Sequence, residues 1–304
     1  MSALPLDTNA RGAFLRGAFY MLAAGLCWSF TGIFLRLAPH FDSWQFLAWR
    51  SLGTAAAFAL IARAGGRASP LKRLVAMGWT GAAAVVALSI ASTGFIVALK
   101  ATTVANALFL SSCSPLLAAV LGYVVLGERL TVVQAASVAL GLVGLAIIVG
   151  GAVEAGGLVG NLCAVLSALG FAVASVAMRF GSRRDYSPAV FGYGAVTFVL
   201  AASVCLANGV TLIAPPFEAA AAFAAGFLLM GLGFTCFLRG APAVPAAGQT
   251  VLAQTETIFG PVWVWLAFGE TPAPATLIGG AVILVAVVSM ATAGARAPLP
   301  NAAT

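Results

Sequence analysis

Apolar residues occur along this chain in long runs, which polar residues interrupt only briefly. A run of about 18–25 mostly apolar residues is long enough to cross a bilayer as a helix. Ten such runs follow one another and predict an all-α membrane protein with ten transmembrane helices. The predicted spans are 14–36, 44–64, 74–98, 104–124, 131–150, 157–179, 187–207, 218–238, 245–268 and 275–293. The first run shows no clear small-residue cleavage site, so we expect a retained helix rather than a signal peptide.

Basic residues between the runs predict the orientation of the chain in the membrane. With the N-terminus in the cytoplasm, twelve basic residues fall on the cytoplasmic side and only Arg36 and Lys100 on the other, while Arg50 falls within a span. This is the positive-inside bias, and it predicts two cytoplasmic termini and an even number of spans. The twelve are Arg11, Arg16, Arg63, Arg67, Lys72, Arg73, Arg129, Arg179, Arg183, Arg184, Arg239 and Arg296.

Two short motifs recur at nearly the same spacing. "VLGERLT" (125–131) and "AFGETPA" (267–273) carry Gly-Glu pairs that lie 142 residues apart. A second match, at a spacing of 143 residues, relates Arg36 and Asp42 to Arg179 and Asp185. The chain therefore divides into a first five-helix repeat, 1–150, and a second, 151–304. Because five is odd, the second repeat enters the membrane from the opposite side, and the two form an inverted repeat.

The repeated motifs also predict local structure. Gly127 and Gly269 are suited to helix C-termini, where a left-handed backbone conformation is common. Thr131 and Gln134 have the spacing of a capping box for the next helix.

Composition agrees with a membrane protein and excludes other classes. The chain is 62% hydrophobic and 8% charged, whereas a soluble chain is about a quarter charged. The net charge of +7 does not indicate nucleic acid, because the bases are dispersed between apolar runs. The five cysteines form no CxxC pair. We expect structural thiols and no metal site or disulfide framework.

The stretches 98–115 ("ALKATTVANALFLSSCSP"), 114–150 and 255–288 ("TETIFGPVWVWLAFGETPAPATLIGGAVILVAVV") carry a family resemblance. They resemble the drug/metabolite transporter superfamily in its ten-helix, EamA-type form with two repeated domains. Within it, the chain is similar to the aromatic amino-acid exporters of bacterial inner membranes. The resemblance implies efflux of amino acids, over a broad range, from a central cavity between the two halves.

The ninth predicted span departs from the family pattern. The family often places an acid directly before proline there, whereas here Glu256 is followed by Thr257. The matching position in the first repeat is Ser114, before Pro115. The carboxylate therefore belongs to one half only.

Glu256 is the main candidate for a functional residue. It is the only acid that falls deep in a predicted span, and ionisable groups there are functional by default. Gln249, Glu256 and Trp263 are spaced by seven, so a continuous helix would place them on one face. Glu256 could bind the ammonium of an amino acid or bind and release a proton. The alternative is a protonated acid that bonds to a neighbouring helix.

Other polar and aromatic residues within the spans are weaker candidates for substrate contacts. Aromatic groups matched across the repeats could hold an apolar side chain, although core packing is an alternative. Hydroxyl groups in membrane helices often bond to their own backbone instead. Asn106 ranks higher, since a buried amide needs several partners. The predicted residues are Trp28, Thr31, Ser89, Thr93, Asn106, Phe171 and Ser175, with Ser92 in the same cluster as Ser89.

Arg50 is the only base within a predicted span. It lies about six residues from the predicted helix start, so its long side chain could reach the membrane interface. We expect this arrangement. The alternatives are a pair with a carboxylate and a contact with substrate.

These residues favour a transporter of small molecules in the lipid bilayer over an enzyme. There is no HExxH metal site, no deep pair of aspartates and no GxSxG nucleophile motif. We therefore expect no catalytic residue, no cofactor and no nucleic-acid partner. Hydrophobic cationic drugs are an alternative substrate class, because an acid with aromatics suits a cation. A channel would more naturally form around an oligomeric axis. The sequence is compatible with a monomer but does not determine the oligomeric state.

Overall fold

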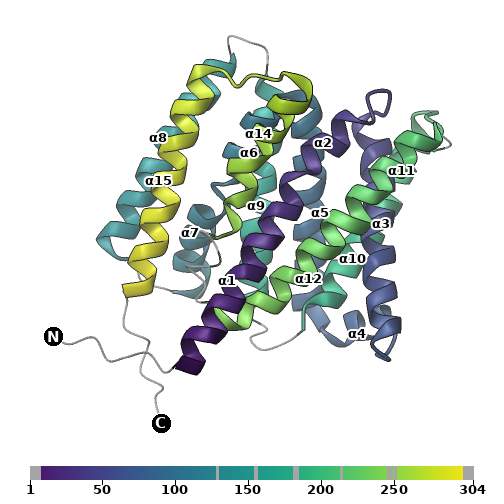
Figure 1. Ribbon diagram of the computed structural model, residues 1–304, viewed down its shortest axis with the longest axis horizontal. Helices are drawn as coiled ribbons and strands as arrows, with labels where there is room; N and C mark the ends of the chain where they lie inside the picture. Colours follow the sequence, from purple (N-terminus) through teal and green to yellow (C-terminus); the bar gives the residue numbers. More distant parts are fainter. Residues whose placement is uncertain are drawn as a thin grey trace.

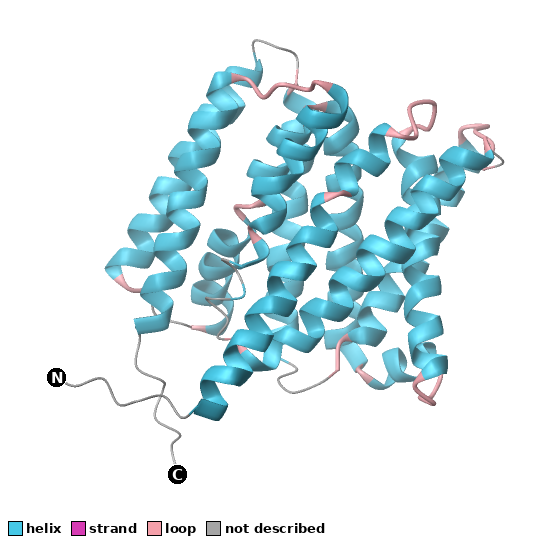
Figure 2. Cartoon of the chain, viewed as in Figure 1, coloured by secondary structure: helices cyan, strands magenta, loops and turns pink. Residues whose placement is uncertain are grey.

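A computed structural model describes residues 8–127, 130–153, 157–180, 185–212, 215–244, 249 and 252–296. Helices account for most of these residues, and none of them forms a strand (Figure 2). The helices are α1 (Thr8–Ser29), α2 (Thr31–Arg36), α3 (Ser43–Ala64), α4 (Pro70–Ala76), α5 (Gly78–Ala101), α6 (Val104–Ser111), α7 (Ser114–Leu126), α8 (Val132–Val153), α9 (Leu158–Phe180), α10 (Ser187–Ala207), α11 (Pro216–Ala224), the π-helix η1 (Ala225–Met230), α12 (Gly231–Gly240), the 3-10 turn η2 (Ala241–Ala243), α14 (Thr255–Phe268) and α15 (Pro274–Arg296).

Most helices stand side by side as a membrane bundle. Within the described residues, eight stretches are long and apolar enough to cross a membrane. They confirm an all-helical, multi-spanning architecture. Helix α3 is not among the eight, since it contains Arg50 and Arg63, and α14 has only 14 residues. The total of ten spans therefore stays a prediction.

The start of α1 and the end of α15 lie at the same, lower, end of the bundle (Figure 1). Arg36 ends α2 at the opposite, upper, end, which we call the Arg36 end. An even number of crossings between the two ends of the chain would produce this arrangement.

Helices of the two halves pack together in matched pairs. Helix α5 packs on α9, and α1 packs on α12. In each pair the first span of one half packs on the third span of the other half, as a two-fold relation between the halves requires. Helices α3 and α10 also pack together, as do α8 and α15. The halves thus interlock along their length.

Glycines bring the last helices of the two halves into close contact. A Cβ added at Gly144 would lie 2.8 Å from Ile283, and one added at Gly279 would lie 2.6 Å from Ile148. Gly144 thus lies opposite Ile283, and Ile148, further along α8, lies opposite Gly279, which comes earlier in α15. The two matched helices are therefore antiparallel. Small residues allow such close approach in membranes. Opposite directions for matched helices are what an inverted repeat requires.

The tightest glycine contact joins α3 to the π-helix η1. A Cβ at Gly226 would lie 1.8 Å from the carbonyl oxygen of Arg50 and 2.8 Å from the amide nitrogen of Thr54. The Thr54 hydroxyl donates to the same Arg50 oxygen at 3.0 Å. Single π-turns in helices often occur at functional sites. Here the π-helix lies against the backbone of Arg50.

We predict that Gly226→Ala destabilises the protein by about 1–3 kcal/mol, because overpacking forces backbone shifts. Thermal unfolding of the purified protein in detergent would show this as a lower melting temperature. Gly150→Ala on α8 is the matched control, since no atom lies within 4 Å of a Cβ added there. Equal melting temperatures for the two variants would contradict the close contact.

Sequence predictions of helix ends are confirmed. Gly127 and Gly269 end α7 and α14 with φ values of 68° and 70°. The amide of Thr131 donates to the Gln134 side chain at 2.8 Å, and the amide of Gln134 donates to the Thr131 hydroxyl at 3.2 Å. This reciprocal pair is the predicted capping box of α8.

Ion pairs connect the two halves at both ends of the bundle. At the Arg36 end, Arg36 pairs with Glu270 at 2.9 Å, and Glu270 also accepts from the amide of Val104, the first residue of α6. His40 Nδ1 lies 2.6 Å from Glu218.

At the opposite end, Asp185 pairs with Arg67 at 3.0 Å and with Arg73 at 2.8 Å. Partial burial raises the pKa of Asp185, but hydrogen bonds from Ser187 and Arg73 outweigh it and lower the pKa overall. The carboxylate is therefore ionised at neutral pH. It links the start of α10 to the α3–α4 region.

Candidate substrate cavity

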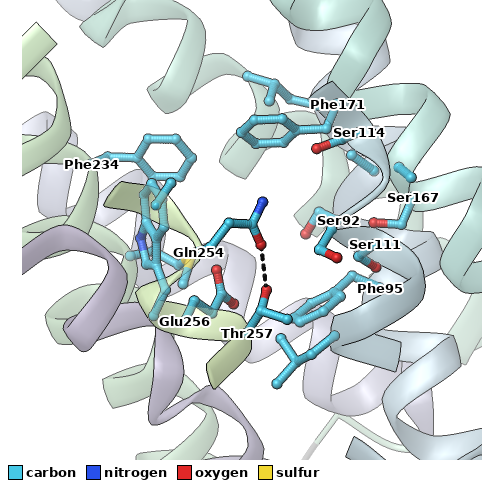
Figure 3. A pocket seen from close by; sticks show the side chains of 18 of the residues that line it. Ser92, Phe95, Ser111, Ser114, Ser167, Phe171, Phe234, Gln254, Glu256 and Thr257 are labelled. Atoms are coloured by element: carbon cyan, nitrogen blue, oxygen red, sulfur yellow. Dashed lines mark hydrogen bonds between the residues drawn. The ribbon is translucent and has the colours of Figure 1, made fainter. Parts of the chain in front are cut away.

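A cavity of about 170 Å³ lies between the two halves, among side chains from α1, α3, α5, α6, α7, α9, α10, η1, α12 and α14. Its walls are mostly aromatic and aliphatic. Figure 3 shows Phe95, Phe171 and Phe234 around a central space. Hydroxyl groups and one amide also face this space, and they come from Ser92, Ser111, Ser114, Ser167, Thr257 and Gln254. Two charged residues complete the lining: Arg50 and Glu256.

Two helix breaks position the polar part of the lining. Helix α6 ends at Ser111 and α7 begins at Ser114, with a turn between them. A turn at Gln254 likewise precedes α14. The Thr257 hydroxyl donates to the Gln254 side chain at 3.0 Å and holds that amide at the break (Figure 3). Discontinuous helices in a transporter commonly place helix termini at the substrate site.

The second break explains why an acid is tolerated in this apolar region. Glu256 lies in the first turn of α14, where the helix dipole stabilises a negative charge. The carboxyl group lines the cavity, and it makes no hydrogen bond or ion pair with any described residue. The alternative of a bond to a neighbouring helix has no support in the described part of the chain. Glu256 is thus available to a ligand.

We expected the Arg50 side chain to reach the membrane interface, and it does not. Its side chain is buried, with 4% of the residue exposed, and it lines the cavity. Nη1 donates to the Ser92 hydroxyl at 2.7 Å, and Nη2 lies 3.0 Å from the Met230 sulfur. Nε has no partner among the residues that the structure describes. The prediction was wrong because α5 and η1 pack against α3 and enclose the guanidinium.

The two charges share the cavity without pairing. No ion pair within 4.0 Å joins them in the described residues, where the pairs found lie at the two ends of the bundle. The cavity therefore holds one unpaired acid and one incompletely bonded base.

Three predicted site residues lie on this cavity: Glu256, Trp28 and Phe171. Trp28 contacts Phe234 edge-on, with ring centroids 5.1 Å apart. The indole also lies close to α12, because Gly233 has no side chain to displace it. Trp28 and Phe171 come from the first span of each half, as the repeat suggested.

Gln249 and Trp263 do not line the cavity with Glu256. The Gln249 amide donates to the carbonyls of Ala241 and Val244, each at 2.8 Å. Trp263 stacks on Phe30 and donates to the Ser29 hydroxyl at 3.0 Å. The turn at Gln254 separates Gln249 from the regular geometry of α14. Glu256 and Trp263 do lie seven residues apart within α14, but Trp263 is two turns further along the helix and packs on Phe30 rather than at the cavity.

The remaining predicted residues also lie outside the cavity. Thr31, Ser89 and Thr93 have buried hydroxyls with no partner among the described residues. The Ser175 hydroxyl donates to the Phe171 carbonyl at 2.8 Å, which is the backbone bond that we gave as the alternative. The pattern of hydroxyl groups therefore did not identify which of them face a cavity.

Asn106 lies at a second cavity of about 310 Å³ near the end of α5, which Lys100 and Thr276 also line. Its amide donates to the Thr102 hydroxyl at 3.1 Å and accepts from the Thr276 hydroxyl. The amide has the several partners that we expected. Both partners are protein groups, and the bond with Thr276 links α6 to α15.

Several cavity residues were not predicted as site residues. Ser92 was noted only as a member of a cluster, and Gln254 and Thr257 flank Glu256 in sequence. Gln254 and Thr257 are polar residues close in sequence to an acid deep in a span, and this signal could have predicted both. Arg50 had a signal as well, since it is the only base within a span. Its burial depends on neighbours from other helices, which the sequence does not specify.

Comparison with known proteins identifies the family. The EamA-like transporter family matches residues 15–150 and again residues 158–292. The chain belongs to the EamA-like transporter family. The two matches show a repeated domain, and membership of this family makes the chain a membrane transporter of small molecules rather than an enzyme.

A solved structure supports the fold. It is described as "Crystal structure of protein", it has a TM-score of 0.66 and 23% sequence identity, and the alignment covers 94% of this chain and 99% of that chain. At this identity the likeness concerns the fold alone. The comparison with curated proteins found no match.

Proposed function

We propose that this EamA-family protein exports amino acids across a bacterial inner membrane by alternating access. In this proposal the repeats 1–150 and 151–304 contribute five spans each, both termini are cytoplasmic, and the cavity between the repeats opens to each side in turn. Positive-inside bias and the repeated domain support the arrangement.

One observation carries the substrate class. An unpaired carboxylate, Glu256, and an incompletely bonded guanidinium, Arg50, line one cavity in the described part of the chain. A zwitterion supplies the opposite charge for each of them. Burying either group without a partner costs several kcal/mol, so a ligand with one ammonium and one carboxylate is favoured over a singly charged ligand.

The walls suit varied apolar side chains. Trp28, Phe171 and Phe234 present aromatic surface from both halves, and aromatic rings accept apolar groups of different shapes. We propose Trp28 and Phe171 as contacts for the substrate side chain and Glu256 as the partner of the ammonium. Hydrophobic cations are less favoured, because the charge of Arg50 in the same cavity would repel them.

Opening of the cavity at the Arg36 end would separate the halves where the Arg36–Glu270 and His40–Glu218 contacts join them. Opening at the other end would separate Asp185 from Arg67 and Arg73. Both sets of contacts join residues of the two halves, and each set would break when its end opens. They are consistent with two closed ends that open alternately.

Transport in proteoliposomes tests the proposal. Purified protein is reconstituted, and uptake of a panel of labelled amino acids and one lipophilic organic cation is measured with and without a pH gradient. We expect uptake of several amino acids with large apolar side chains. Transport of the cation without transport of any amino acid would contradict the proposed substrate class. The pH-gradient arm shows whether protons are coupled to transport.

A further inference from the structure

We propose that the Nε–Nη2 edge of Arg50 is the subsite for the substrate carboxylate, and that Ser92 positions this edge. The proposal rests on the function proposed above and names the group of the substrate that Arg50 binds. Ser92 is a positioning residue, because it acts through the guanidinium.

The hydrogen bonds of Arg50 distinguish the two edges of its guanidinium. Nη1 donates to the Ser92 hydroxyl at 2.7 Å, which is a short, charge-assisted bond. Nη2 has only the Met230 sulfur at 3.0 Å within the described chain, and a thioether is a weak acceptor. Nε is buried and has no acceptor among the same described residues. Nη1 is thus the best satisfied of the three nitrogens, and Nε and Nη2 are the poorly satisfied ones.

An unsatisfied donor on a buried charge is costly. Leaving a buried donor without an acceptor costs about 1–3 kcal/mol, and more for a charged group. The side chain is 4% exposed, so bulk water does not supply the acceptors. The cavity that Arg50 lines is the space from which an acceptor can reach it. A ligand that fills this space is therefore expected to bring oxygen atoms to Arg50.

The shape of the free edge favours a carboxylate. Nε and Nη2 carry parallel N–H groups on one side of the planar guanidinium, and the two oxygens of a carboxylate accept from such a pair simultaneously. A single hydroxyl or carbonyl oxygen could accept from both N–H groups only through two bent, weaker bonds. The weak contact of Nη2 with Met230 can be exchanged for a stronger bond.

Ser92 determines which edge is free. It lies on α5 and accepts from Nη1 of Arg50, which lies on α3. This bond limits rotation of the guanidinium and so fixes the direction of its Nε–Nη2 edge. Glu256 comes from α14 and makes no ion pair with Arg50. The acid therefore does not occupy this edge and can take the ammonium of the same substrate.

The experiment compares a zwitterion with a ligand that lacks its carboxylate. L-phenylalanine and phenethylamine share the aromatic ring and the ammonium. Transport of labelled phenylalanine gives KM and maximal rate in proteoliposomes, and inhibition by phenethylamine gives the affinity for the amine. The variants are Ser92→Ala, Ser92→Thr, which keeps a hydroxyl, and Ser89→Ala on the same helix, whose hydroxyl does not line the cavity.

We expect Ser92→Ala to raise the KM for phenylalanine about tenfold with little change in maximal rate, which corresponds to one weakened charge-assisted bond. Inhibition by phenethylamine should stay at the wild-type level. Ser92→Thr should restore the KM, and Ser89→Ala should match wild type. Melting temperatures of all variants show whether each is folded.

Three results would overturn the proposal. They are an unchanged KM in Ser92→Ala, an equal loss for phenylalanine and phenethylamine, and a failure of Ser92→Thr to improve on Ser92→Ala. Failure of phenethylamine to bind even to wild type would support a required carboxylate. If wild-type protein transports amines but no amino acid, the proposed function fails, which is a result distinct from failure of the Ser92 role.

Discussion

Glu256→Gln is expected to reduce transport of every amino acid by about 100-fold or more while the protein remains folded. The substitution keeps the size of the side chain and removes its charge. Removal of one partner from a buried charge pair costs roughly 3–5 kcal/mol, which corresponds to a loss of this size or larger. Glu256 has no protein partner in the described residues, so the charge is not needed to hold α14 in place.

Initial rates of uptake in proteoliposomes measure this effect, with size-exclusion profiles and melting temperatures as the test of folding. Trp263→Phe is the matched control on the same helix. Trp263 lies outside the cavity and bonds to Ser29, so its loss should leave transport near the wild-type level. Unchanged transport by Glu256→Gln would show that the acid has a structural role only.

Arg50→Met is expected to reduce amino-acid transport about 100-fold without lowering the melting temperature. Methionine occupies part of the same volume and carries no charge. Replacing a buried charge with an apolar group is often neutral or stabilising, whereas the substrate carboxylate would lose its partner. Loss of transport together with retained stability is the result that a purely structural arginine would not give.

Arg50→Lys separates charge from shape. Lysine keeps the positive charge but cannot offer two parallel donors, so we expect a loss of about tenfold, smaller than that of Arg50→Met. Arg63→Met is the control, because Arg63 is an exposed base on the same helix α3.

A zwitterion needs both charges, so the double variant Arg50→Met, Glu256→Gln should lose less transport than the product of the two single losses. Wild-type transport by Arg50→Met would contradict the assignment.

The helices were predictable to within a few residues, because apolar runs of membrane length leave little alternative. Where the prediction was incomplete, the cause is a break within a span. The first span is divided at Phe30, the fourth between Ser111 and Ser114, and the ninth has a turn at Gln254. Pro115 in the first turn of α7 is a local signal for the break in the fourth span. No proline lies at Phe30 or Gln254, so local sequence signals did not predict the other two breaks.

Three of the ten predicted site residues lie on the central cavity. Helical spacing failed for Gln249, because it presupposed a helix that the turn at Gln254 interrupts. Trp263 lies on the same helix as Glu256, but it packs on Phe30 two turns from the cavity. Trp28 and Phe171 were found because the repeat relates their positions. Arg50 was misplaced, since a long basic side chain can reach the interface or a cavity equally well from the same position along a helix.

The amino-acid sequence by itself determined the membrane class, the approximate helices, the repeat and the presence of one acid in an apolar span. These properties depend on residue type and spacing along one chain: hydrophobic length specifies the spans, and recurring motifs specify the repeat. Only the tertiary structure decided which polar groups face the cavity and which bond elsewhere. That decision depends on contacts between helices far apart in sequence, such as Arg50 with Ser92 and Met230. The cavity in which Arg50 and Glu256 lie without forming an ion pair exists because helices of both halves, among them α3, α5, η1 and α14, surround it.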